Sequence, residues 1–347
     1  MSETIKIQPA GRVDYVDFIR GFLIIWVVWC HTTCPEIVAF YVRVPVFFFI
    51  SGTFFRWRPF KPFINKLLKK TLIPFLFFYV VSYVYRIFLY YWDFREIQTF
   101  DYLMIFDVFH WDCCRVDYLS VNVPLWYFIG FVIIQLSFWV LYKISSNRWF
   151  ITPATILLFI AGNLLEIYQI PLPFMLPQSF LNALYFGAGV VLGKKLMETL
   201  EHKKESIYLF FIAAVLFLML VSIPFSMKKE IVNAIRSMPF IVIVFFFFRN
   251  VYRIPFFKPL HFYGINSLTI LGSHVLIQTI YRRILFKYLH ESSIISGCID
   301  VLLTVITLYF VIRFFNRYLP RFVGNVNFGR TSFTPPGSQS SPLSVLG

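Results

Sequence analysis

The chain has 347 residues, of which 59% are hydrophobic and 21% aromatic, while only 14% are charged. This composition excludes an ordinary soluble domain, because one core cannot bury so much apolar side-chain surface. The net charge of +15 does not indicate a nucleic-acid partner, since the basic residues lie in short segments between long apolar runs. We therefore predict an all-α polytopic membrane protein whose main partner is the lipid bilayer.

Apolar runs of membrane-spanning length follow one another along almost the whole chain. A helix needs roughly 20 apolar residues to cross about 30 Å of hydrocarbon. The runs near this length predict about ten transmembrane helices, at residues 17–33, 38–55, 71–92, 124–142, 149–165, 180–197, 206–224, 231–248, 264–286 and 294–315. We expect one membrane domain over residues 1–330 and a disordered tail over residues 331–347, which is rich in Ser and Pro.

Charged residues between the runs predict the orientation of the bundle. Residues 56–70 contain six basic residues and no acidic one, whereas residues 93–122 contain six acidic and two basic residues. Because cytoplasmic segments are enriched in Lys and Arg, we place residues 56–70 in the cytoplasm and residues 93–122 outside. An even number of spans then makes both termini cytoplasmic. Two basic clusters oppose this prediction by falling at the outer face: Lys228 and Lys229, and Arg282, Arg283 and Lys287.

The first predicted span contains three ionisable residues, Asp17, Arg20 and His31. On an α-helix, the step from Arg20 to His31 brings both residues to one face within roughly 20° and separates them by about 16 Å along the axis. Asp17 and Arg20 are three positions apart and can pair. Ionisable side chains are costly in hydrocarbon, so a shared face indicates a polar pathway inside the bundle. The alternative is an interfacial ion pair and a histidine at a helix end.

Further candidate residues lie near the end of the second predicted span and just before the third. Ser51 and Gly52 follow a run of phenylalanines, and small residues there allow close helix packing. Lys69 and Lys70 precede the third span. They either set topology and touch anionic lipid, or bind the phosphates of a nucleotide-bearing donor.

Later candidates are Trp126 at the start of the fourth span, and Asn266 and His274 in the ninth. An aromatic belt explains Trp126 equally well. A lone intramembrane histidine is either a hydrogen-bonded packing residue or part of a site. The sequence contains no glycine-rich phosphate loop, no metal-ligand spacing and no nucleophilic-serine motif, so we expect no metal and no bound cofactor.

Taken in order, these motifs resemble those of the membrane acyltransferase 3 family, and most closely its fucose 4-O-acetylase-like branch. The motifs are Asp17-x-x-Arg20-Gly21 with ten residues between Arg20 and His31, Pro45-x-Phe47-Phe48-Phe49-Ile50-Ser51-Gly52, Lys69-Lys70 before Pro74, Leu125-Trp126-Tyr127-Phe128, and Asn266-Ser267-Leu268 leading to His274. Together they extend over nearly the whole chain, and the N-terminal ones are the most specific.

The resemblance implies a ten-helix O-acyltransferase of the bacterial inner membrane. Such an enzyme moves an acyl group, usually acetyl, from cytoplasmic acyl-CoA to a sugar hydroxyl of a cell-surface or lipid-linked glycan. Acetyl-CoA or another acyl-CoA is then a co-substrate. The resemblance also implies that Arg20 and His31, which match the Arg-x10-His element of the family, are required for activity.

We expect His31 to be the general base that takes the proton of the acceptor hydroxyl, or the carrier of a transient acyl group. Arg20 either pairs with Asp17 or steadies the donor. Ser51, Lys69, Lys70, Trp126, Asn266 and His274 are the candidate substrate-binding residues. A transporter or flippase of a lipid-linked glycan is the alternative, although the sequence shows no internal repeat of the kind that many transporters have.

Overall fold

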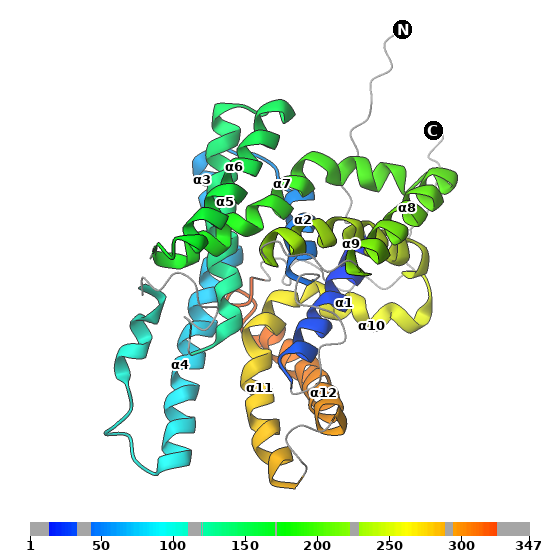
Figure 1. Cartoon of the computed structure of the whole chain (residues 1–347). Helices are drawn as coiled ribbons and strands as arrows, with labels where there is room; N and C mark the ends of the chain where they lie inside the picture. The colour runs from blue at the N-terminus through cyan, green and yellow to red at the C-terminus, as the bar shows by residue number, and fades with distance from the viewer. Residues whose placement is uncertain are drawn as a thin grey trace, which may run out of the picture.

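The computed structural model describes residues 14–32, 43–109, 119, 121–170, 172–222, 229–288 and 294–324. Within these ranges the chain is helical and forms no strand, as the all-α prediction requires. In Figure 1, α1 and α2 lie near the middle of the bundle, between the group of α5, α6 and α7 and the pair of α8 and α9. The predicted tail over residues 331–347 lies outside the described residues, as do residues 110–118 of the predicted outer segment.

The described residues form twelve α-helices and several short 3-10 or π-helical turns. In chain order they are α1 (Asp14–Cys30), α2 (Arg43–Thr53), α3 (Phe60–Leu67), the π-helical turn η2 (Leu68–Leu72), α4 (Ile73–Phe94), the 3-10 helices η3 (Tyr102–Phe109) and η5 (Val123–Leu125), α5 (Trp126–Ile144), α6 (Arg148–Ile167), the 3-10 helix η6 (Pro173–Met175), α7 (Leu176–Thr199), α8 (Lys203–Ser222), α9 (Lys229–Val251), the 3-10 helix η7 (Pro255–Phe257), α10 (Lys258–Ile265), α11 (Ser267–Tyr288) and α12 (Ile294–Tyr318).

Seven helical stretches among the described residues are long and apolar enough to cross a membrane. They are Phe60–Phe94, Val123–Ile144, Arg148–Ile167, Pro173–Thr199, Lys203–Ser222, Ile231–Val251 and Ile294–Tyr318. Each overlaps one of the ten predicted spans, and six contain theirs completely; the predicted span 206–224 ends two residues beyond Ser222, outside the described residues. The chain is therefore a multi-pass membrane protein, and the total of about ten spans stays a prediction.

The other three predicted spans correspond to α1, α2 and α11, which are short or interrupted by polar residues. Among the described residues α1 has 17 and α2 has 11, fewer than the roughly 20 that cross the hydrocarbon. α11 has 22 residues, but His274, Gln278 and Arg282 lie along it. Helices of this kind are stable in a membrane where other helices surround them. These three helices carry Asp17, Arg20, Ser51 and His274, while His31 directly follows α1 and Asn266 directly precedes α11.

Small residues allow the central helices to pack at backbone distance. A Cβ atom added at Gly52 of α2 would overlap the carbonyl group of Phe186 in α7. A Cβ at Gly264 of α10 would likewise overlap the carbonyl group of Asp17 in α1. The close packing predicted at Gly52 is therefore present, and an equivalent crossing fixes α1 against α10. Large buried rings fill the spaces elsewhere, among them Phe48 and Phe138.

Two residues of the basic cluster Arg282, Arg283 and Lys287, which opposed the predicted orientation, pair with acidic residues. Arg283 forms two hydrogen bonds of 2.7 Å with the carboxylate of Asp93, at the end of α4. Arg282 Nε lies 3.4 Å from Asp300 Oδ2 in α12. Two of the three basic side chains thus have an acidic partner in the structure.

Candidate active site

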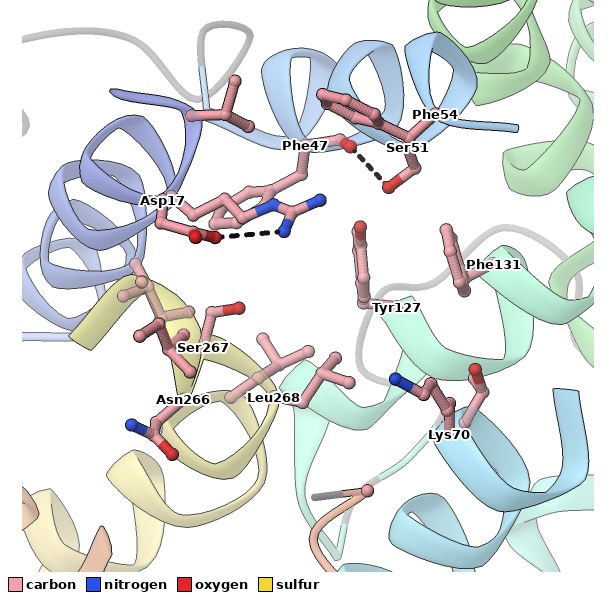
Figure 2. Close-up of a pocket in the computed structure, with 18 of the residues that line it drawn as sticks. Asp17, Phe47, Ser51, Phe54, Lys70, Tyr127, Phe131, Asn266, Ser267 and Leu268 are labelled. Carbon is pink, nitrogen blue, oxygen red and sulfur yellow. Dashed lines mark hydrogen bonds and ion pairs between the residues drawn. The ribbon is translucent and has the colours of Figure 1, made fainter. Parts of the chain in front are cut away.

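One cavity of about 800 Å³ lies between the central helices and brings most of the predicted site residues together. α1, α2, α5, α7 and the start of α11 contribute to its wall, together with η2 (Figure 2). The predicted site residues that line it are Asp17, Arg20, His31, Ser51, Lys70, Trp126 and Asn266. A volume of this size is within the range of pockets that bind small molecules and cofactors.

Asp17 and Arg20 form the pair that their spacing predicted. The Asp17 side chain is almost fully buried, and its Oδ1 lies 3.4 Å from Nη1 of Arg20. The second oxygen, Oδ2, is 4.0 Å from Nε2 of His261, which belongs to α10. The Asp17 carboxylate therefore lies between Arg20 of its own helix and His261 of α10. The Arg20 side chain stays about one-third exposed at the cavity wall.

His31 lies in the turn directly after α1, where its backbone N–H donates to the carbonyl oxygen of Val28 at 3.2 Å. Its side chain lines the same cavity as Arg20, in agreement with the face predicted from their spacing. Behind it lies His274 of α11, with a ring-centroid separation of 5.2 Å. His274 is fully buried and does not line the cavity.

Ser51 and the aromatic residues at the start of α5 face the cavity between α1 and η2. Ser51 Oγ donates to the carbonyl oxygen of Phe47 one turn earlier, at 2.8 Å. In Figure 2 the hydroxyl end of Tyr127 points toward Ser51 across the open space. Trp126, the neighbouring residue, also lines the cavity but is only 5% exposed. Tyr127 thus offers the more accessible polar group of this pair.

Of the three lysines in and next to the π-helical turn η2, two face the cavity. Lys66 and Lys70 are one turn apart and both line it, whereas Lys69 does not. Figure 2 shows the Lys70 side chain directed into the cavity. π-helical turns are rare and are frequent at functional sites, because the additional residue changes which side chains share a face. Of the two predicted lysines, the structure therefore places one at the site.

Asn266 lies at the break between α10 and α11 and is bonded on both sides. Its Nδ2 donates to the carbonyl oxygen of Phe262 at 2.8 Å, and its Oδ1 accepts from Nδ2 of Asn316 at 2.9 Å. It lines the cavity with Ser267, but these bonds tie it to α12. Its clearest observed role is to fix the helix break.

The cavity wall is strongly basic. The basic residues lining it are Arg20, Arg43, Arg56, Lys66, Lys70 and Lys194, and the only acidic residue lining it among those described is Asp17. Such a wall suits a ligand with several negative charges, since Lys and Arg form charge-assisted hydrogen bonds with phosphate.

Sequence reasoning missed several of these residues. Arg43 begins α2 and is buried, and Lys194 comes from α7. His261 meets Asp17 only because α10 crosses α1. The charge of Arg43 within an apolar run was an available signal, because cations in such runs face a protein interior. The other two residues carry no such signal.

Comparison with known proteins identifies the family. The family model Acyl_transf_3, described as an acyltransferase domain, matches residues 13–315. The chain belongs to this acyltransferase family. The match covers all ten predicted spans and includes every residue proposed for the site. No curated protein and no solved structure matches the chain. The protein is thus a membrane acyltransferase, and its central cavity is lined by Asp17, Arg20 and His31.

Proposed function

We propose that this acyltransferase is an O-acetyltransferase that moves an acetyl group from acetyl-CoA to a sugar hydroxyl of a cell-surface or lipid-linked glycan. One observation carries the proposal: a single cavity connects His31 with the basic residues at Lys66 and Lys70. Coenzyme A combines phosphates with a long arm that ends in the thioester. A cavity with a cationic part and a histidine elsewhere on its wall fits such a donor.

The proposed reaction needs a base, a place for the donor and an acceptor. His31 takes the proton of the acceptor hydroxyl as the hydroxyl oxygen bonds to the acyl carbon. The carbon–sulfur bond then breaks, and the thiolate of coenzyme A receives the proton from the imidazolium. Arg20, Lys66 and Lys70 bind the donor, while Ser51 and Tyr127 line the space between them. No metal or bound cofactor takes part in this scheme.

The location follows from the same scheme. Acyl-CoA is a cytoplasmic metabolite, so the end of the cavity at residues 56–70 faces the cytoplasm, in agreement with the positive-inside distribution. The end at His31 then faces outward, where a glycan acceptor is found. We place the protein in the inner membrane of a bacterium. Lys69, outside the cavity wall, is left to contact anionic lipid.

Release of coenzyme A by the purified protein in lipid nanodiscs tests the proposal. The wild-type protein should release coenzyme A from acetyl-CoA in the presence of glycan acceptors, and His31→Ala should not. Mass analysis of surface glycans from cells with and without the gene should show acetyl groups that depend on it. Movement of a lipid-linked glycan across vesicles without any coenzyme A release would instead favour a flippase.

A further inference from the structure

His274 lies inside the bundle behind His31 and has no access to the cavity. Its side chain is 0% exposed. The His31 and His274 ring centroids are 5.2 Å apart, and the ring planes are tilted by 56°. A separation this small places the two imidazoles in contact. His31 follows α1 and His274 belongs to α11, so the contact joins two helices that are far apart in the sequence.

A hydrogen bond defines the tautomer of His274. Its Nδ1 lies 2.8 Å from the carbonyl oxygen of Ile270. A carbonyl oxygen can only accept, so in the neutral ring Nδ1 carries the proton and Nε2 carries a lone pair. Nε2 is buried and has no hydrogen-bond partner among the described residues. A buried acceptor without a donor is costly, so a nearby N–H or O–H group should meet it.

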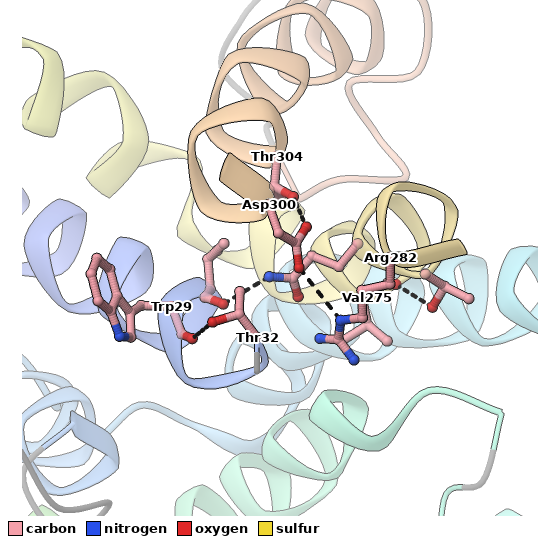
Figure 3. Close-up of polar contacts among 9 residues, drawn as sticks. Trp29, Thr32, Val275, Arg282, Asp300 and Thr304 are labelled. Atoms are coloured by element: carbon pink, nitrogen blue, oxygen red, sulfur yellow. Dashed lines mark hydrogen bonds and ion pairs between the residues drawn. The ribbon is translucent and has the colours of Figure 1, made fainter. Parts of the chain in front are cut away.

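Gln278, one turn further along α11, fixes the turn that carries His31. Its Nε2 donates to the carbonyl oxygen of Val28 at 2.8 Å, which is the oxygen that also accepts the backbone N–H of His31. Figure 3 shows the surrounding polar contacts, in which Thr32 bonds to Trp29 and Arg282 approaches Asp300. The end of α1 is therefore tied to α11, which keeps His31 beside His274.

Building on the proposed acyl transfer, we infer that His274 is a positioning residue for His31. The two rings share no hydrogen bond in this structure, and rotation of the neighbouring His31 ring brings one of its ring N–H groups to Nε2 of His274, which accepts the bond. The other ring nitrogen of His31 then carries a lone pair, which is the form that a base requires. A base oriented by a third group is the arrangement that activates many nucleophiles.

The inferred hydrogen bond acts during the proton transfer. When the acceptor proton moves to the free nitrogen of His31, the ring becomes an imidazolium, and the bond to His274 becomes charge-assisted and stronger. The proton later passes to the departing thiolate, which restores the starting tautomer. In this arrangement His274 touches neither substrate, in contrast to the substrate-binding role predicted from the sequence.

The competing explanation is that a buried water molecule satisfies Nε2 and that His274 only fills space. The two explanations differ in what happens to His31. If a water binds Nε2, removing the imidazole leaves the His31 tautomer unchanged. If Nε2 binds His31, removing the His274 imidazole allows the His31 ring to adopt both tautomers.

Nitrogen NMR of protein labelled with ¹⁵N-histidine measures this directly, with the His31 signals assigned from their loss in His31→Ala. The wild type should show one dominant His31 tautomer, and His274→Leu should show a mixture. His274→Gln, which keeps an acceptor at that distance, should preserve the wild-type tautomer. Ser273→Ala is the matched control, because Ser273 is a buried neighbour that bonds to its own helix. An unchanged tautomer in His274→Leu overturns the inference.

Kinetics supply an independent readout. His274→Leu should lower kcat roughly 10- to 100-fold, the scale seen when the partner that orients an active-site imidazole is lost. The KM for acetyl-CoA should stay within about twofold, because the missing bond acts in the transition state. A raised KM with unchanged kcat overturns the inference. Should His274→Leu not fold, loss of the dominant tautomer in His274→Gln would overturn it. The NMR test needs no substrate, so absent wild-type turnover would contradict only the proposed function.

Discussion

Arg20, in α1, and His31, the residue directly after α1, line one cavity. α1 is too short to isolate them from each other, and the cavity runs along its inner face. Asp17 anchors the far end of this face through Arg20 and His261. The residues of this helix therefore have separable roles, and single substitutions can distinguish them.

Replacing His31 with Ala should abolish acyl transfer while the protein stays folded in the membrane. Its side chain lines the cavity, and loss of a general base costs about 10²- to 10⁴-fold in rate. Coenzyme A release by purified protein measures the rate, and size-exclusion chromatography in detergent checks the fold. An effect of only twofold would remove His31 from the proposed mechanism. A radioactive acetyl group retained by the wild-type protein would favour the acyl-histidine route.

Arg20→Lys should damage activity although the charge is kept. Arg presents a planar set of donors, so it can hold Asp17 and a donor group at the same time, whereas Lys offers a single point charge. We expect kcat/KM for acetyl-CoA to fall at least about tenfold, which corresponds to roughly 1.4 kcal/mol of lost transition-state binding. Equal activity of Arg20→Lys and the wild type would show that only the positive charge matters.

At the scale of the helices, η2 orients the lysines. Because Lys70 faces the cavity and Lys69 does not, the two neighbours form a matched pair. Lys70→Ala should raise the KM for acetyl-CoA more than it lowers kcat, since a phosphate contact serves binding before and during the reaction. The variant should also bind the donor with a weaker dependence on salt. Lys69→Ala should leave both constants unchanged. A KM effect confined to Lys69→Ala would contradict the orientation of η2.

The crossing of α2 and α7 should be sensitive to a single methyl group. Gly52→Ala places a Cβ against the Phe186 backbone, which cannot move aside, and we expect a loss of about 1–3 kcal/mol in the free energy of unfolding. Gly130→Ala in α5 is the control, because its nearest neighbour would be the Ser179 Oγ at 3.4 Å. Thermal unfolding in detergent compares them. Equal stability of the two variants would mean that α2 and α7 are not in backbone contact.

At the scale of the whole molecule, orientation in the membrane is the main prediction. We expect both termini and residues 56–70 to be cytoplasmic, and residues 93–122 to be outside. Lys61 and Asp101 are exposed and suit single-cysteine labelling, after the five native cysteines are replaced. An impermeant reagent applied to intact cells should label Asp101→Cys and not Lys61→Cys. The reverse pattern would invert the bundle and would place Lys66 and Lys70 away from cytoplasmic acyl-CoA.

The sequence by itself determined the helical class, because its apolar runs have the roughly 20 residues that a membrane helix needs, whereas a strand of a membrane barrel needs only about 9–11. It also predicted from the helix repeat that Arg20 and His31 lie on the same side; both line one cavity, although α1 ends one residue before His31. Within the described residues, each predicted span overlaps a helix.

The tertiary structure alone decided which distant residues meet. His274 lies against His31, and His261 against Asp17, because α10 and α11 pack on α1 across more than two hundred residues of sequence. The tertiary structure also decided between Lys69 and Lys70, because only the packing of η2 against the other helices shows which of the two neighbours faces the cavity. Contacts between helices depend on crossing points such as Gly264. A glycine can be recognised in the sequence, but the helix that packs against it cannot.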